Sequence, residues 1–242
     1  MKFLKLVEND PRALTPKILS AIVEEQTKDQ RPPDDWVHCS EVGTCPMKIA
    51  LRLSGIKGEF SQGSYLNFFI GKLIHSGYQR VLVGKVLESA EATLRLPSLK
   101  LVGHDDGHGQ TFVAEFKTMS KDARRIGNRP QRHHVLQITA YLKLLEKNQG
   151  NLIYIDKSNG QLEEYILEFD DADWAEIVKR IALARKFEEE LKNPWPDKAL
   201  QNEAMASECL FYWESWECGY CQFARSCPIK DSILLLWKER RK

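Results

Sequence analysis

Two acidic residues and a lysine have a spacing that suits hydrolytic metal chemistry. Gly103-His104-Asp105-Asp106 is expected to end one strand, and Glu115-Phe116-Lys117 to lie on a neighbouring strand after a short turn. Side chains two apart on a strand share a face, so Glu115 and Lys117 should project together while Phe116 packs the other way and leaves its carbonyl near the site. With Asp106 they would form an oxygen-rich pocket for Mg²⁺ or Mn²⁺, which can bind a water and a phosphate oxygen together. The same residue types also occur on solvated strands without a catalytic role.

A histidine and a glutamine–tyrosine pair are candidates to complete this pocket. Helical spacing over 66–83 puts five residues on one face, which should turn His75 inward: Phe68, Gly71, His75, Tyr78 and Leu82. His75 would then be either a Mn²⁺ ligand or a core histidine bonded to a carbonyl. Gln137 and Tyr141, spaced i, i+4 beside an apolar stripe, could hold Lys117, water or the DNA backbone, or could decorate the surface.

Three of the six cysteines fall within ten residues, in the pattern Cys218-x2-Cys221-x5-Cys227. In a reducing compartment this density indicates a metal centre. Cys45 is the preferred fourth ligand because it precedes Pro46 at a predicted helix N-terminus, where amide dipoles favour a thiolate; Cys39 and Cys209 are its rivals. Spacing alone leaves Zn²⁺ and an iron–sulfur cluster both open, and either would anchor the C-terminal region to residue 45.

The net charge of +1 gives the whole molecule little attraction for nucleic acid, so a polyanion site must be local. The clearest local excess of cations follows the catalytic motif, and its nucleic-acid-binding candidates beyond Lys117 are Lys121, Arg124, Arg125, Arg129 and Arg132. The chain has no Walker A pattern, which excludes a helicase motor within it. No apolar run suits a membrane span and the first residues do not resemble a secretory signal, so a cytoplasmic protein without a membrane association is expected.

The elements that must position these residues follow a mixed α/β order. Helical periodicity predicts helices over about 15–27, from 46 to 54, over 66–83, around 135–145 and over 174–191. Alternation predicts successive antiparallel strands between 92 and 118, then strands at 151–155 and 161–169. Residues 197–242 have too little regular pattern to form a core without a cross-link. The predicted division is an N-terminal helical extension (1–37), a core (38–200) and a cysteine-rich segment packed on the core (201–242).

Taken together, these motifs resemble the RecB-like exonucleases of the PD-(D/E)XK superfamily that carry a four-cysteine iron–sulfur cluster. The group includes CRISPR-associated four-cysteine nucleases and the AddB nuclease domain. The resemblance runs from about residue 38 to 229 and rests on Gly71-x3-His75, Gly103-x2-Asp106, Glu115-x-Lys117, Gln137-x3-Tyr141 and the cysteine set. The chain departs from the family at Met47, where arginine is frequent, and Asp105 beside Asp106 leaves the metal-binding aspartate ambiguous, Asp106 being chosen from the spacing.

The resemblance implies a restriction-endonuclease-like mixed sheet flanked by helices, joined to a [4Fe–4S] cluster on Cys45, Cys218, Cys221 and Cys227. It implies Mg²⁺ or Mn²⁺ on His75, Asp106, Glu115 and the Phe116 carbonyl. Lys117 would serve the attacking water. The implied activity is hydrolysis of single-stranded or end-frayed DNA. A non-cleaving nucleic-acid-binding module and a zinc-stabilised subunit of a recombination, repair or CRISPR-adaptation complex are the alternatives, and the oligomeric state is undetermined.

Overall fold

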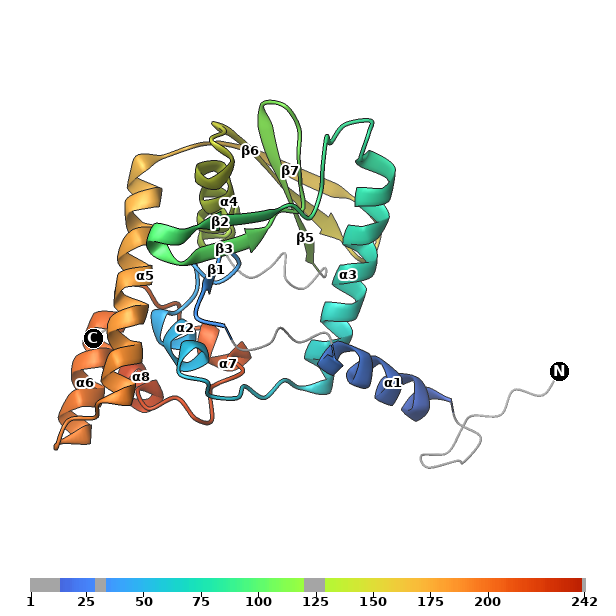
Figure 1. Ribbon diagram of the computed structural model, residues 1–242. Helices are drawn as coiled ribbons and strands as arrows, with labels where there is room; N and C mark the ends of the chain where they lie inside the picture. Colours follow the sequence, from blue (N-terminus) through green and yellow to red (C-terminus); the bar gives the residue numbers. More distant parts are fainter. Residues whose placement is uncertain (1–13, 29–33, 120–128, 241–242) are drawn as a thin grey trace.

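Two β-sheets and the helices around them build the frame of the molecule. Figure 1 shows the computed structural model, which describes residues 14–28, 34–119 and 129–240. The first sheet has the order β1-β3-β2, from β1 (Val37–His38), β2 (Thr93–Leu96) and β3 (Leu101–His104). The second has the order β4-β5-β6-β7, from β4 (Gly107–His108), β5 (Phe112–Met119), β6 (Gln149–Asp156) and β7 (Leu162–Glu168). The pairs β1–β3 and β5–β6 are parallel and the others antiparallel, so the expected mixed α/β fold is confirmed.

The expectation of successive antiparallel strands between 92 and 118 is confirmed for two pairs, β2 with β3 and β4 with β5, but these pairs lie in different sheets. β3 and β5 belong to different sheets, and the two-residue strand β4 pairs with β5 between them. Asp105, which follows β3 in the chain, is fully buried. Its carboxylate accepts the Ala92 N–H at 2.8 Å and lies 2.5 Å from Nδ1 of His108. These contacts join the residue before β2, in the first sheet, to β4, in the second, at the point where the chain passes from one sheet to the other.

The first five helices of the described segments agree with the periodicity of the sequence, whereas the three C-terminal helices were not expected. The helices are α1 (Thr15–Lys28), α2 (Pro46–Leu53), α3 (Gln62–Leu82), α4 (Arg132–Leu145), α5 (Asp171–Lys192), α6 (Lys198–Cys209), α7 (Glu217–Tyr220) and α8 (Lys230–Glu239), with a short 3₁₀ helix at Pro97–Leu99. Side-chain caps begin several of them: Ser61 accepts the Ser64 N–H, and Asp170 accepts the Ala172 N–H. No helix within these described segments is long and apolar enough to cross a bilayer.

The second sheet lies between α3 and α4, and its alternation decides which residues reach each helix. Ala114 and Phe116 of β5 pack with residues of α3 such as Tyr78, whereas Val113 packs with the buried face of α4. Glu115 therefore projects toward α4. The predicted division of the motif between the two faces of β5 is confirmed.

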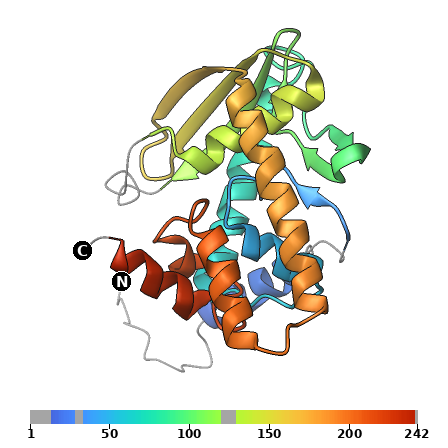
Figure 2. The ribbon, with the colours of Figure 1, turned by 90° about the vertical axis from the view of Figure 1, so that its left-hand side faces the viewer.

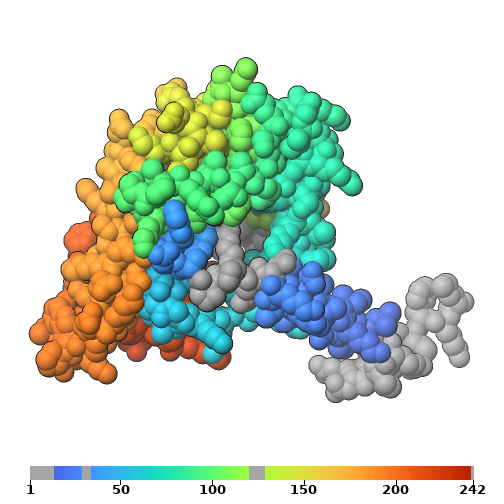
Figure 3. All heavy atoms as spheres, viewed as in Figure 1, coloured from blue at the N-terminus to red at the C-terminus, as the bar shows by residue number. Residues whose placement is uncertain are grey.

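A helical base lies beneath the sheets, and α5 runs down to it from the sheet region (Figures 1 and 2). There α2 packs on α5, and α6 packs on α8. Their buried apolar residues, including Met47, Phe187 and Met205, form a second hydrophobic cluster. The C-terminal segment is more regular than the sequence indicated, since it contains α6, α7 and α8, and its dependence on a cross-link stays a prediction. In the space-filling view α1 extends outward from the body near the start of α3 (Figure 3).

Candidate active site and cysteine pocket

Asp106 lies in the connection just before β4, not on a strand as the sequence indicated. One of its carboxylate oxygens, Oδ2, accepts the main-chain N–H of Phe116 at 2.7 Å. The two residues of β4 pair only with Val113 and Ala114 of β5, so β4 offers no partner for Phe116. The Asp106 carboxylate accepts the Phe116 N–H instead. Asp106 is thereby fixed beside the Glu115-Phe116-Lys117 motif.

Glu115 is the most deeply buried acid of the site, with 2% of its surface exposed. Oε1 lies 2.6 Å from Nζ of Lys117 and accepts Nε2 of Gln137 at 2.8 Å, whereas Oε2 is buried without a hydrogen-bond partner. Burial, reinforced by the neighbouring Asp106 carboxylate, raises the pKa of Glu115 to about 7. A buried carboxylate oxygen without a partner in an acidic pocket is suited to a cation.

Lys117 is held by Gln137, whose Oε1 accepts an Nζ proton at 2.8 Å. Gln137 also reaches the Tyr141 hydroxyl at 3.4 Å, and that hydroxyl donates to the carbonyl of His104 at 2.8 Å. Both Gln137 and Tyr141 are buried, which excludes the alternative that they decorate the surface. Burial also raises the pKa of Tyr141 well above its usual value, so the phenol stays protonated.

His75 reaches the site from α3, with Nδ1 3.2 Å from Oδ1 of Asp106. Burial alone would lower the pKa of His75, but the hydrogen bond and charge of Asp106 outweigh it and raise that pKa. The expected inward face of α3 holds only in part. Tyr78 packs on Phe116, but Phe68 is 44% exposed, because α3 extends beyond the sheet at its N-terminal end.

The chemical types of these side chains suit a divalent cation. Asp106, Glu115 and His75 line one pocket of about 220 Å³ with Lys117, and they supply the oxygen and imidazole donors that Mg²⁺ or Mn²⁺ accepts. Among the described residues, no three histidine, cysteine or acidic side chains have an arrangement that would hold an ion as they stand. Lys117 contacts Oε1 of Glu115, and Nδ1 of His75 contacts Oδ1 of Asp106, so these atoms contact each other in this structure.

Sequence reasoning missed several residues around this pocket. Cys39 and Glu91 line it, and Gln79 donates both to the Asp106 carbonyl at 3.0 Å and to Glu91 at 2.9 Å. Gln79 is one helical turn from His75, a spacing that could have indicated it. Asp105 is committed to the Ala92 N–H and His108, which supports the choice of Asp106 as the residue that faces the site.

Of the predicted nucleic-acid-binding residues, Lys121, Arg124 and Arg125 lie outside the described residues. Arg129 forms an ion pair with Glu163, and its guanidinium lies 5.6 Å from the centre of the Tyr154 ring. Arg132 pairs with Asp173 and Glu176. Both arginines thus have intramolecular partners, and their contact with nucleic acid stays a prediction.

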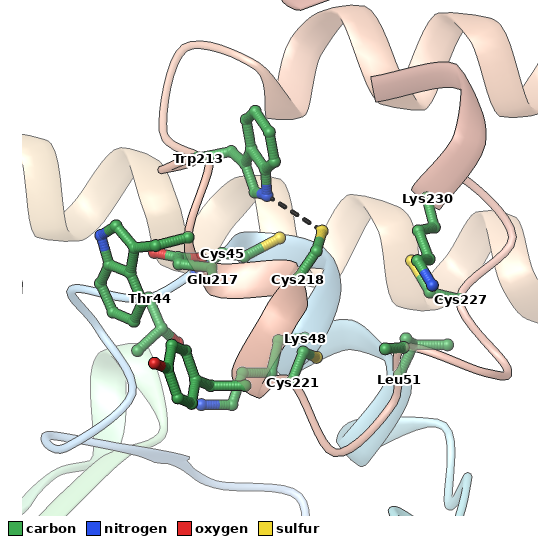
Figure 4. A pocket seen from close by; sticks show the side chains of 13 residues that line it. Thr44, Cys45, Lys48, Leu51, Trp213, Glu217, Cys218, Cys221, Cys227 and Lys230 are labelled. Carbon is green, nitrogen blue, oxygen red and sulfur yellow. Dashed lines mark hydrogen bonds between the residues drawn. The ribbon is translucent and has the colours of Figure 1, made fainter. Parts of the chain in front are cut away.

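The four predicted cluster cysteines come together at the helical base. Cys45 precedes α2, and it lines one pocket of about 70 Å³ with Cys218, Cys221 and Cys227 (Figure 4). Of the two rivals, Cys39 lines the acidic pocket instead, whereas Cys209 lies close, with its sulfur 3.3 Å from that of Cys45. The hydrogen bond with Cys209, together with burial, raises the pKa of Cys45 well above its usual value.

The donor set of this pocket fits a thiolate-bound metal centre, since four sulfurs border one space and a helix N-terminus adjoins Cys45. Two further residues that sequence reasoning missed contact these cysteines, and one of them, Trp213, bonds a sulfur. The indole N–H of Trp213 donates to the Cys218 sulfur at 3.3 Å, and Glu217 accepts the Cys45 N–H at 2.9 Å. Hydrogen bonds to ligand sulfurs are a usual accompaniment of such centres.

Comparison with known proteins gives concordant matches. The family model described as the PD-(D/E)XK nuclease superfamily matches residues 99–228, more than half of the chain. A curated relative, the CRISPR-associated exonuclease Cas4 of Saccharolobus solfataricus, is 26% identical over 223 residues, covering 88% of this chain and 92% of the relative.

Solved structures with the same fold include SSO0001, with a TM-score of 0.58, 22% identity and coverage of 90% of this chain and 97% of that one. The alkaline exonuclease of Laribacter hongkongensis is 17% identical, with a TM-score of 0.48 over 70% of this chain and 95% of its own. The family match covers Asp106, strand β5 with Glu115 and Lys117, and the cysteines of the C-terminal segment up to Cys227. The chain therefore belongs to the PD-(D/E)XK nuclease superfamily, and the resemblance read from its motifs is confirmed.

Proposed function

We propose that this nuclease is a Mg²⁺- or Mn²⁺-dependent exodeoxyribonuclease that acts on single-stranded or frayed DNA ends. The observation that carries the proposal is the partnerless buried Oε2 of Glu115, beside Asp106 and His75 in one pocket. Superfamily membership supports the nuclease chemistry, and the curated relative, named an exonuclease, supports attack from an end.

The metal would be held by Asp106, Glu115, His75 and the main-chain carbonyl of Phe116. When bound it would supply a more acidic water and neutralise charge on the phosphate. The Lys117 ammonium, fixed by Gln137, would orient the water or a phosphate oxygen through its Nζ protons. The Tyr141 hydroxyl accepts a hydrogen bond from Gln137 and donates its own proton to the His104 carbonyl. Tyr141 would therefore act as a positioning residue for Gln137.

We further propose that Cys45, Cys218, Cys221 and Cys227 hold a [4Fe–4S] cluster, with zinc as the alternative metal. The centre would join the start of α2 to the segment around α7, which lie side by side at the base of the molecule. Its role would be structural, because it lies apart from the acidic pocket and shares no lining residue with it.

The test is an assay of anaerobically purified protein on end-labelled single-stranded DNA with Mn²⁺. Wild type is compared with Asp106→Ala and with Glu59→Gln, a matched control at an exposed surface acid. We expect short products from linear DNA, no cleavage of a circular single strand, no activity in Asp106→Ala and unchanged activity in the control. Cleavage of the circle would contradict the exonuclease assignment, and activity indifferent to Asp106 would contradict the site. The visible spectrum and metal content of the same samples distinguish iron–sulfur from zinc.

A further inference from the structure

A second cleft adjoins the acidic pocket, and Lys117 lines both. It measures about 390 Å³, within the range of small-molecule binding sites. Its lining comes from α3, the ends of β5 and β6, and the start of α4: Asn67, Phe68, Lys117, Thr118, Met119, Arg129, Gln131, His134, Tyr154 and Lys157. If a phosphate of a DNA strand binds in the acidic pocket beside Lys117, the next nucleotide of that strand can lie in this cleft.

The charge of the cleft suits a nucleic-acid strand. Lys117, Arg129 and Lys157 line it, and none of the described lining residues is acidic. Glu163 pairs with Arg129 but is not among the lining residues, and Lys157 donates to Oδ1 of Asn67 at 3.1 Å. Local cationic charge of this kind favours phosphate even though the net charge of the chain is only +1.

Phe68 gives the cleft an exposed aromatic ring. Its neighbours Phe60 and Tyr65 meet it edge to face, at centroid distances of 5.1 and 6.5 Å and interplanar angles of 89° and 88°. These T-shaped contacts support the ring without burying it. An exposed aromatic side chain beside lysine and arginine is the arrangement on which unpaired bases stack.

We infer that this cleft binds the nucleotide next to the scissile phosphate, with its base stacked on Phe68 and a phosphate on Lys157. The inference rests on the proposed nuclease function and makes its substrate class more specific. A base held inside the cleft against Phe68 would be unpaired. Strand ends that are single or melted would thus be selected at this position.

The experiment measures equilibrium binding of a fluorescein-labelled oligonucleotide to the full chain in Ca²⁺, so that it does not depend on cleavage. A series of strands carries one abasic site at successive positions. For wild type, an abasic site at one position should weaken binding by about tenfold or more, which is the contribution of one stacked base. Phe68→Leu keeps the apolar contacts but lacks a ring, so an abasic site at that position should no longer weaken binding. In Phe68→Tyr the abasic site should weaken binding as in wild type.

Leu73→Ala is the matched control, because Leu73 lies on the same helix and is 58% exposed. It should bind like wild type. Lys157→Gln should weaken binding of all strands and reduce the salt dependence by about one charge. The inference is overturned if no abasic position matters in wild type, if Phe68→Leu keeps the wild-type profile, or if a fully paired hairpin end competes equally well. Because the readout is binding, these outcomes are separate from loss of cleavage, which bears on the proposed function.

Discussion

The carboxylate of Asp106 accepts the main-chain N–H of Phe116 at 2.7 Å, which ties the candidate metal-binding aspartate to the strand that carries Glu115 and Lys117. This bond gives Asp106 two roles that substitution can separate. One role is to accept the N–H of a strand, which any side chain of similar length with an oxygen at its end can fulfil. The other is the negative charge offered to a cation, which only a carboxylate can fill.

We expect Asp106→Asn and Asp106→Ala to differ in stability but not in activity. Asparagine retains a side-chain oxygen for the Phe116 N–H, whereas alanine leaves that N–H without an acceptor at a cost of about 1–3 kcal/mol. Both should lose nuclease activity. Chemical denaturation and the Mn²⁺-dependent assay check the two effects. Equal stability of the two variants would contradict the structural role of the carboxylate.

Lys117→Ala should lower the cleavage rate by about 10²–10⁴-fold while leaving folding and most DNA binding intact. Gln137→Leu should lower it less, and we expect Gln137 to act through Lys117, whose Nζ donates to it. If so, the double variant should be no slower than Lys117→Ala alone. Single-turnover rates of the three variants test this, and additive losses would show that Gln137 acts independently of the lysine.

Cys221→Ser should lose metal and stability together. A cross-link between residues 45 and 221 closes a loop longer than a hundred residues, and a cross-link of that reach contributes on the order of 4 kcal/mol. Metal analysis, the visible spectrum and the melting temperature give the readout.

Two other cysteines serve as matched controls for this prediction. Cys39→Ser should retain metal, since Cys39 lines the acidic pocket, and Cys209→Ala should retain it if Cys45 is the fourth ligand. Loss of metal in Cys209→Ala with retention in Cys45→Ser would reassign the ligand.

Local patterns predicted many of the residues that line the acidic pocket, because local rules determine how they are placed on their elements. Alternation along β5 places Glu115 and Lys117 on one face, and helical spacing places Gln137 one turn from Tyr141. The four cysteines were recognised by density and by the helix N-terminus at Cys45. None of these inferences required knowledge of the tertiary packing.

Features that depend on long-range packing were not predictable in this way. β3 and β5 belong to different sheets, and the buried Asp105 that follows β3 bonds both Ala92 and His108, contacts that no periodicity shows. Phe68 shares the helical face of His75, yet it is exposed because the sheet does not extend as far along α3. Periodicity assigns a residue to a face of its helix but not to the element that covers that face.

Gly103 and Gly71, both in the motifs of the resemblance, should respond oppositely to alanine. A Cβ at Gly103 would lie 2.7 Å from both the Cys39 sulfur and the Tyr141 ring, so Gly103→Ala should cost about 1–3 kcal/mol. A Cβ at Gly71 would meet nothing closer than Thr118 Oγ1 at 3.7 Å. Gly71→Ala should therefore raise stability by about 0.5–1 kcal/mol, the helical preference for alanine. Denaturant midpoints decide both, and destabilisation by Gly71→Ala would contradict the packing described for α3.

Two half-buried histidines at the start of α4 should make stability depend on pH. Burial lowers the pKa of His133 to about 4 and also lowers that of His134. The hydroxyl of Tyr154 accepts the Gln131 N–H at 3.1 Å and lies 2.9 Å from Nδ1 of His134, which accepts the hydroxyl proton when the ring is neutral and Nδ1 carries no proton. The unfolded chain takes up these protons near pH 6.5, but the folded chain does not until lower pH. Each histidine therefore lowers the free energy of unfolding as pH falls below about 6.5, by up to about 1.4 kcal/mol per pH unit.

His134→Gln isolates this effect, because glutamine can still accept the Tyr154 hydroxyl but does not titrate. A comparison of variants is needed, since burial raises the pKa of Glu115 and Glu217 to about 7. Folded carboxyls with raised pKa values bind protons that the unfolded chain releases, so they make the folded state more stable as pH falls from about 7 toward 4.5. We expect His134→Gln to lose less stability than wild type between about pH 6.5 and 5. Urea titrations at both pH values measure the difference, and parallel losses in the two proteins would mean that His134 takes up its proton in the folded state as readily as in the unfolded chain.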